Sequence, residues 1–279
     1  MCVRGSWTCA TIRDQLNIMS SSPGSKRRVL VTGAAGTVGC SVCRGLLDAG
    51  YPVRGFDRVP MPGGLEAVDL CLGELTDGDA VSKAVEDCDS VIHLAAVPYP
   101  DQPLPGPMCD ANIVGLYHVM EACRTRAVHR VVLTSSVMVA WGLPWQERVV
   151  TLADGIKPDS HYALTKLFAE QTGEMYSRLY GMSVIAIRLG HHLRQAEDLE
   201  RTRQSIAKQS IFVSSPDAGK AFRLAVEAGD IAVGGFATVY ITSRHVQPCG
   251  FDLEPARRVL GYVPDDVFPN NALCHNRAR

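Results

Sequence analysis

A glycine-rich turn between an apolar run and a helical segment is the feature that most constrains the fold of this 279-residue chain. The run Val29–Thr32 is short, apolar and β-branched, which predicts a buried strand. The segment Thr37–Ala49 has apolar residues at helical spacing and is followed by a glycine. Between them, Gly33, Gly36 and Gly39 follow the spacing G-x-x-G-x-x-G. A strand, a glycine turn and a helix in this order predict the first unit of a doubly wound α/β sheet.

The rest of the chain continues the alternation of apolar strands and helical segments. We expect further strands at 53–57, 67–70, 90–94, 130–134, 183–188 and 238–242, and helices at 79–88, 109–126, 162–179, 217–228 and 254–260. Strands that are apolar almost throughout predict a parallel sheet with helices on both faces, a Rossmann-type α/β fold. We expect residues 1–28 to be a disordered extension, 29–190 a dinucleotide-binding domain, and 191–279 a small substrate-binding lobe and tail intertwined with it.

Composition excludes several classes of partner. The formal net charge of -1 gives no reason to expect nucleic acid or an anionic membrane. No apolar run approaches the roughly 18 residues of a membrane span. The ten cysteines are scattered, and the close pair Cys40 and Cys43 falls in the first predicted helix, where packing is favoured over metal binding. Free thiols in this number predict a reducing cytoplasm, and their scattered spacing predicts no metal. The partner that we expect is a small-molecule substrate.

The glycine turn predicts a site for a dinucleotide. It allows a tight turn and close backbone approach to a pyrophosphate, and Thr37 and Val38 begin the helix whose N-terminus would face the phosphates. Asp57 ends the second strand, 18 residues beyond Gly39. A carboxylate there accepts hydrogen bonds from the adenosine ribose and repels a 2′-phosphate, so we expect NAD. Arg58 beside it can receive such a phosphate, which keeps NADP as the less favoured alternative.

Tyr162 and Lys166 form a pair at helical spacing downstream of the turn. Residues i and i+4 share one helix face, and a nearby ammonium lowers the pKa of a phenol, which makes it a usable acid or base. Ser135 and Ser136 follow a predicted strand, at the carboxyl edge where such sheets bind ligands, and can hydrogen-bond a substrate oxygen. A lone Y-x-x-x-K pair is usually a surface pair. With the turn, Asp57 and the serines, it predicts hydride transfer between nicotinamide and an alcohol or carbonyl.

These motifs together resemble the extended branch of the short-chain dehydrogenase/reductase superfamily, the NAD-dependent epimerase/dehydratase family, over about residues 29–270. The resemblance implies that Tyr162 is the acid/base and that Lys166 contacts the nicotinamide ribose and lowers the tyrosine pKa. It implies that Ser136 positions the carbonyl, with Ser135 in reserve, and that Asn112 holds the active-site architecture. Further cofactor contacts implied by the resemblance are Leu94, Ala95, Ala96 and, where the family has aspartate-leucine, Glu74 and Leu75.

Within that branch, the segments 112–117 and 260–264 resemble uronate dehydrogenases and related NAD-dependent sugar dehydrogenases. The uronate enzymes oxidise a cyclic uronic acid to its aldaric lactone and carry an Asn-His pair directly after the second serine. This chain has Val137 and Met138 there, so the resemblance predicts a sugar-like substrate but leaves uronate open. An arginine beyond the sixth strand binds the substrate carboxylate in that group, and Arg203 or Arg201 can serve here.

Two other functions and an assembly follow from the same residues. A nucleotide-sugar epimerase or dehydratase is the first alternative, although only 113 residues follow Lys166 and leave room for a small lobe. The second is an NAD-binding redox sensor without turnover, a class that often loses the tyrosine or the lysine. The resemblance also implies a homodimer or higher homo-oligomer through helices near 112–126 and 160–179.

Overall fold

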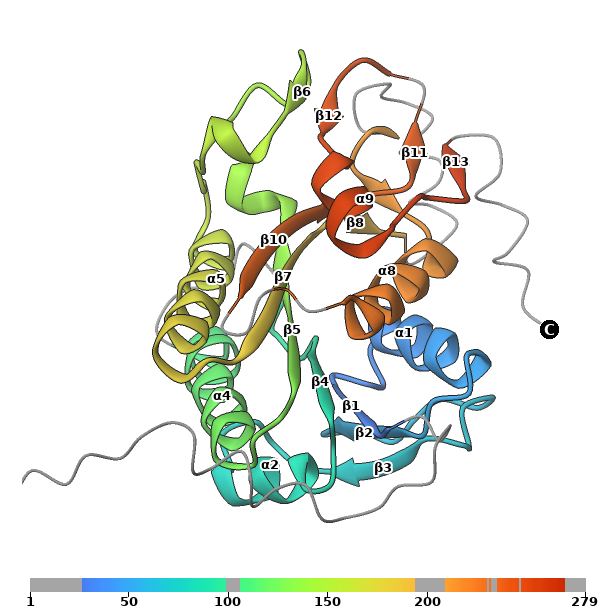
Figure 1. Ribbon diagram of the computed structural model, residues 1–279, viewed down its shortest axis with the longest axis vertical. Helices are drawn as coiled ribbons and strands as arrows, with labels where there is room; N and C mark the ends of the chain where they lie inside the picture. The colour runs from blue at the N-terminus through green and yellow to red at the C-terminus, as the bar shows by residue number, and fades with distance from the viewer. Residues whose placement is uncertain are drawn as a thin grey trace, which may run out of the picture.

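A seven-stranded parallel sheet forms the centre of the structure (Figure 1). The computed structural model describes residues 27–98, 106–193, 209–229, 231, 235–245 and 247–268. The strands lie in the order β10 (Phe236–Ile241), β7 (Ser183–Leu189), β5 (Arg130–Ser136), β4 (Ser90–His93), β1 (Val29–Thr32), β2 (Val53–Asp57) and β3 (Asp69–Leu72). Every neighbouring pair is parallel, so all seven carboxyl ends meet at one edge.

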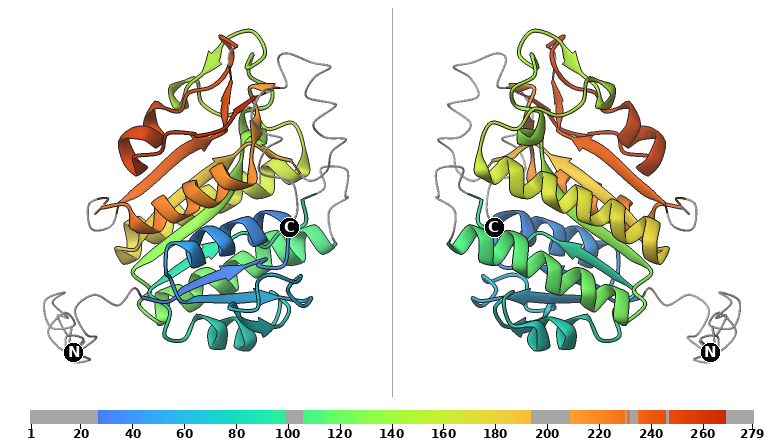
Figure 2. Two further views of the ribbon diagram at one scale, coloured as in Figure 1. Left: turned by 90° about the vertical axis from the view of Figure 1, so that its right-hand side faces the viewer. Right: turned by 90° about the vertical axis from the view of Figure 1, so that its left-hand side faces the viewer.

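Helices cover both faces of the sheet, which confirms the predicted doubly wound fold (Figure 2). On one face α1 (Thr37–Asp48) packs against α8 (Ser215–Glu227), and α9 (Glu254–Leu260) lies beside α8 and β10. On the other face lie α2 (Gly78–Val85), α4 (Gly115–Thr125) and α5 (His161–Tyr180). Because both faces are covered, the strands are apolar on both sides.

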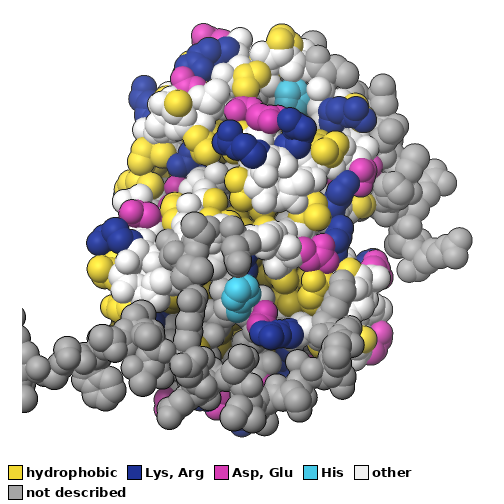
Figure 3. Space-filling view, viewed as in Figure 1, with side chains coloured by type: hydrophobic (Ala, Val, Ile, Leu, Met, Phe, Trp, Pro, Cys, Tyr) yellow, Lys and Arg dark blue, Asp and Glu magenta, His cyan; other side chains and the backbone are white. Residues whose placement is uncertain are grey.

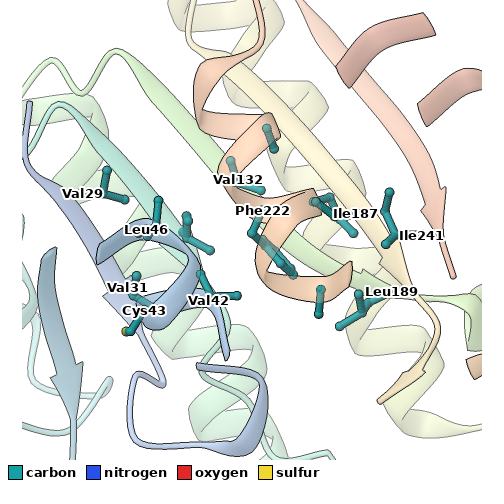
Figure 4. Close-up of a cluster of buried hydrophobic side chains, with 14 of the residues drawn as sticks. Val29, Val31, Val42, Cys43, Leu46, Val132, Ile187, Leu189, Phe222 and Ile241 are labelled. Atoms are coloured by element: carbon teal, nitrogen blue, oxygen red, sulfur yellow. The ribbon is translucent and has the colours of Figure 1, made fainter. Parts of the chain in front are cut away.

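The hydrophobic core shows why this sequence pattern gives this layering (Figure 4). Along β1, Val29 and Val31 point to the layer of α1 and α8, where they pack in one cluster with Leu46 and Phe222. The residue between them, Leu30, belongs to the cluster beneath α2 and α4. Alternate residues of a strand face opposite sides, so one short strand supplies both halves of the core.

The order of the strands reverses at the middle of the sheet. After β1 the chain moves to β2 and β3 on one side, whereas β4, β5, β7 and β10 lie on the other. Helices that leave β1 and β4 in opposite directions open a crevice at the carboxyl edge, where open α/β sheets bind their ligands. The fold therefore places the glycine turn after β1 and the end of β4 at the same crevice.

The structure differs from the sequence prediction in a few elements. The third strand lies at Asp69–Leu72, two residues beyond the predicted position. The single helix predicted at 109–126 is instead α3 (Pro107–Cys109), a π-helical turn η1 (Asp110–Val114) and α4. Three pairs of two-residue strands were not predicted: β6 (Val149–Val150) with β12 (Gly250–Phe251), β8 (His191–His192) with β9 (Phe212–Val213), and β11 (Arg244–His245) with β13 (Val267–Phe268).

The surface of the described part of the chain carries both charges. Figure 3 shows basic and acidic side chains interspersed over one face, rather than gathered by sign. Among the helices of the described ranges, none combines the length and apolar character needed to cross a bilayer.

Candidate active site

A cleft of about 960 Å³ follows the carboxyl edge of the sheet and brings most of the predicted site residues together. Its walls include the glycine turn after β1, Asp57 at the end of β2, and Ser136 at the end of β5. The predicted residues that line it are Gly33, Gly36, Thr37, Val38, Gly39, Asp57, Arg58, Glu74, Leu75, Leu94, Ala95, Ala96, Ser135, Ser136, Tyr162 and Lys166. Arg201 and Arg203 lie outside the described residues.

The glycine turn leaves the N-terminus of α1 open toward this cleft. Gly33 has a φ of +71°, a conformation that favours glycine, and a Cβ on Gly39 would overlap the carbonyl oxygens of Gly33 and Ala34. Gly36 caps the helix without a side-chain hydrogen bond, and the first turn holds no acidic residue. The first amides of α1 therefore suit a phosphate group, which is the fit that a dinucleotide requires.

Asp57 is fixed at the end of β2 by the backbone around it. One carboxylate oxygen accepts a hydrogen bond from the amide of Ala35 at 3.0 Å, and the other accepts one from the amide of Arg58 at 2.8 Å. The carboxylate is thus joined to the glycine turn and lies at the same wall of the cleft. The second oxygen also accepts a hydrogen bond from the amide of Val59 at 3.3 Å, so the oxygen bonded to Ala35 is the one that retains a lone pair for a ribose hydroxyl.

Tyr162 and Lys166 lie in the first turns of α5, which begins where the hydroxyl of Ser160 accepts a hydrogen bond from the amide of Ala163. The ammonium of Lys166 is 5.6 Å from the centre of the Tyr162 ring. Lys166 is only 6% exposed, and burial lowers its pKa from 10.5 to about 8. No carboxylate of the described residues forms an ion pair with it. A positive charge on Lys166 can therefore act on the phenol without being neutralised by such a pair.

His93 ends β4 beside this lysine without adding charge. The imidazole is buried, and its Nδ1 lies 2.8 Å from the hydroxyl oxygen of Thr32. Burial, and then the charge of Lys166, lower the pKa of His93 to about 3. The ring is therefore neutral at physiological pH and leaves Lys166 as the cation of this part of the site.

The two serines at the end of β5 have different surroundings. The hydroxyl of Ser135 donates to a carboxylate oxygen of Glu170 at 2.5 Å. The hydroxyl oxygen of Ser136 instead accepts a hydrogen bond from the amide of Met138 at 3.2 Å, which leaves its own proton to be donated. Both serines line the cleft, but Ser136 is the one whose donor is not committed to Glu170.

A buried ion pair behind these residues was not predicted from the sequence. Glu170 accepts two hydrogen bonds from the guanidinium of Arg188 in β7, both at 2.9 Å. The same guanidinium donates to the hydroxyl of Tyr240 in β10 at 2.8 Å, and the two charged side chains are 4% and 6% exposed. Glu170 lies four residues after Lys166, so the spacing that places Tyr162 and Lys166 on one helix face also points to it.

Asn112 lies in the π-helical turn and joins two walls of the site. Its amide group exchanges hydrogen bonds with the backbone of Val97, at 2.8 and 3.2 Å, and donates to the hydroxyl of Thr165 at 3.0 Å. Thr165 precedes Lys166 on α5, and Val97 lines the cleft after β4. The side chain of Asn112 thereby connects the loop after β4 to α5.

Comparison with known proteins agrees with this arrangement. The model of the NAD dependent epimerase/dehydratase family matches residues 29–208, more than half of the chain. The chain belongs to this family. Members of the NAD-dependent epimerase/dehydratase family are similar to it over most of its length and include sugar dehydrogenases.

Three of these similar proteins define the likeness. The L-arabinose 1-dehydrogenase (NAD(P)(+)) of Haloferax volcanii is 32% identical, over 86% of this chain and 96% of its own. The uronate dehydrogenase of Pseudomonas syringae pv. tomato is 34% identical, over 58% of each chain. The structure of a glucuronic acid dehydrogenase from Chromohalobacter salexigens superposes with a TM-score of 0.73 at 28% identity, over 86% of this chain and 85% of that one.

The buried pair of Glu170 and Arg188 gives a prediction about stability. Glu170→Gln leaves the guanidinium buried without its counter-charge, so urea denaturation should show a loss of about 3 kcal/mol in the free energy of unfolding. Glu254→Gln removes a carboxylate from an exposed pair with Arg257 and is the matched control, with little change expected. Equal effects of the two substitutions would contradict the assignment of Glu170 as a buried anchor.

The buried ammonium of Lys166 gives a prediction with a defined pH dependence. Its pKa is about 8 in the folded state, below the ordinary 10.5. Below pH 8 the folded protein therefore carries the buried ammonium, which lowers its free energy of unfolding. In cofactor-free protein, Lys166→Met should therefore raise the free energy of unfolding by roughly 2–3 kcal/mol at pH 7. The gain should fall below about 1 kcal/mol at pH 10, where the folded protein holds the neutral amine. A Lys166→Met variant with a lower free energy of unfolding than wild type at pH 7 would contradict the conclusion that the buried ammonium is destabilising.

Proposed function

We propose that this chain is an NAD-dependent dehydrogenase of a sugar-like alcohol, in which Tyr162 exchanges the proton. The observation that supports it most is the placement of Tyr162, the buried Lys166 and Ser136 in the same cleft as the open N-terminus of α1. Such a site accommodates a dinucleotide and an oxygen-bearing carbon at adjacent positions. The sugar dehydrogenases among its relatives support the same class of substrate.

Each of the three side chains has a distinct part in this proposal. When bound, NAD supplies the hydride acceptor. Tyr162 takes the proton of the substrate hydroxyl as its phenolate, a form that the nearby ammonium of Lys166 stabilises. Ser136 donates its hydroxyl proton to the substrate oxygen and holds it beside the phenol. Ser135 supports the site from behind through Glu170.

Substitutions at the tyrosine and the serines test these parts. Tyr162→Phe should reduce kcat by at least about a thousandfold with a nearly unchanged Kd for NAD, because only the proton carrier is lost. Ser136→Ala should reduce kcat by about a hundredfold, and Ser135→Ala by much less. The measurements are steady-state kinetics and calorimetric titration with NAD. A near-normal kcat in Tyr162→Phe would overturn the proposal.

The choice between NAD and NADP depends on Asp57. Its carboxylate is held at the ribose end of the proposed cofactor site, where it repels a 2′-phosphate, so we expect kcat/KM to be at least about tenfold higher with NAD. Asp57→Ser should reduce the ratio of kcat/KM with NAD to kcat/KM with NADP. Arg58→Ala should increase that ratio, because it removes the cation that can receive the 2′-phosphate. A wild-type preference for NADP would refute this part of the proposal.

We also propose that the chain forms a homodimer through α4 and α5. These adjacent helices, together with the end of η1, expose a stripe of large apolar side chains, which monomers rarely leave uncovered: Val114, Tyr117, Leu164, Phe168, Met175 and Leu179. A two-fold axis would bring two such stripes together and bury them.

The cysteines that the structure describes are free thiols, which supports our proposal that the protein works in a reducing cytoplasm.

Sedimentation measures the assembly directly. We expect a dimer at micromolar concentration, and a monomer after Leu164→Arg with Phe168→Arg, since two charges then face the axis. Leu72→Arg, at a residue that is 63% exposed on the edge strand β3, is the control and should leave the dimer intact. A wild-type monomer, or a dimer that survives the double substitution, would contradict this interface.

A further inference from the structure

Thr32 and His93 end the two strands between which the order of the sheet reverses. They are direct neighbours in the register of β1 and β4, and the Nδ1 atom of His93 lies 2.8 Å from the hydroxyl oxygen of Thr32. Thr32 is 1% exposed and His93 is 6% exposed, so water does not readily replace either partner. The pair therefore forms a buried hydrogen bond between the strands at the edge where the crevice opens.

The hydroxyl of Thr32 is the donor of this bond. Its oxygen accepts a hydrogen bond from the amide of Ala95 at 3.3 Å. The ring of His93 is neutral, so it has one donor and one acceptor nitrogen. Among the described residues, Nδ1 of His93 is the one acceptor within reach of the hydroxyl proton. Donation to Nδ1 satisfies the amide, the hydroxyl and this nitrogen together, and it places the proton of the imidazole on Nε2.

The same threonine holds the chain after β4 against the glycine turn. The amide of Leu94 donates to the backbone oxygen of Thr32 at 3.2 Å, directly before the bond from Ala95 to its hydroxyl. A Cβ on Gly33 would lie 2.7 Å from the backbone nitrogen of Ala95, so the two segments touch with no space for a side chain between them. Gly33, Leu94 and Ala95 all line the cleft. A shift at this junction would therefore move two walls of the cofactor site.

We propose that Thr32 and His93 act as one positioning unit, which keeps the cleft in the shape that binds NAD. This inference rests on the cofactor of the proposed function and deepens that function, since it assigns a role to two residues that take no part in the proton transfer. A cleft that is already ordered loses less conformational entropy when a ligand binds. Loss of the bond between Thr32 and His93 should therefore weaken the binding of NAD.

Substitutions that remove the bond from either side test the unit by calorimetric titration with NAD. Thr32→Val removes the hydroxyl, keeps the shape of the side chain and should raise the Kd about tenfold. His93→Leu removes the acceptor, leaves the bond from Ala95 in place and should raise the Kd about fivefold. The double variant should bind NAD no more weakly than Thr32→Val, because both substitutions remove the same bond. A double variant whose effect is the product of the two single effects would overturn the proposal.

Two further variants keep the bond and should restore the affinity. Thr32→Ser retains the hydroxyl, and His93→Asn retains an acceptor near the position of Nδ1, so both should bind NAD within about twofold of wild type. Thr242→Val is the matched control. Thr242 is buried at the same edge of the sheet, after β10, and in the described part of the chain its hydroxyl has no hydrogen-bond partner. This control should leave the Kd for NAD unchanged.

Urea denaturation of the same variants separates positioning from stability. A pair with a purely structural role would lower the free energy of unfolding and leave the Kd of the folded protein unchanged. That result, or a His93→Asn variant that binds NAD as weakly as His93→Leu, would contradict the proposal. A wild-type chain that binds no NAD would overturn the cofactor and the inference together. Normal binding of NAD without turnover of any alcohol would overturn the proposed function and leave the positioning unit standing.

Discussion

The buried ion pair between Glu170 and Arg188 is the interaction on which the geometry of the site depends. It joins α5 to β7 with two hydrogen bonds at 2.9 Å and reaches β5 through Ser135. One helical turn before Glu170 is Lys166, and two turns before it is Tyr162, so a helix fixed at Glu170 is fixed for both. A buried pair of this kind adds little to the free energy of unfolding, but separating its partners leaves an unpaired buried charge, which is costly. A shift of α5 along the sheet would separate them, so the pair favours one position of the helix.

The same helix carries an energetic cost at a residue of the proposed site. Lys166 holds an ammonium in a place where burial lowers its pKa to about 8 and no described carboxylate pairs with it. Asn112 holds the adjacent Thr165 against the loop after β4, through a π-helical turn of the type that is frequent at functional sites. Anchors on both sides of Lys166 thus keep a destabilising charge next to a phenol, as expected where strain at a site is maintained by the surrounding fold.

Patterns of residues close together in the sequence predicted those features of the fold that depend on sequence neighbours. The strand, glycine turn and helix at residues 29–49 could be predicted, because turn-forming residues and the spacing of apolar residues determine structure over a few positions. The closeness of Tyr162 and Lys166 was predictable for the same reason, since four residues make one helical turn. The hydrogen bond that commits the hydroxyl of Ser135 could not be predicted, because its partner Glu170 lies 35 residues away in the sequence. The π-helical turn was not predicted either, and the partners of Asn112 within it, Val97 and Thr165, are 15 and 53 residues away in the sequence.

We propose above that hydride passes from a sugar carbon to NAD, which is then released as NADH, while Tyr162 takes the proton. The most direct measurement follows that hydrogen, with a sugar substrate labelled with deuterium at the carbon that is oxidised. We expect one deuterium in the NADH released for each sugar oxidised, and no transfer by Tyr162→Phe. Deuterium retained in an epimerised sugar without release of NADH, or transfer at a normal rate by Tyr162→Phe, would contradict this proposal.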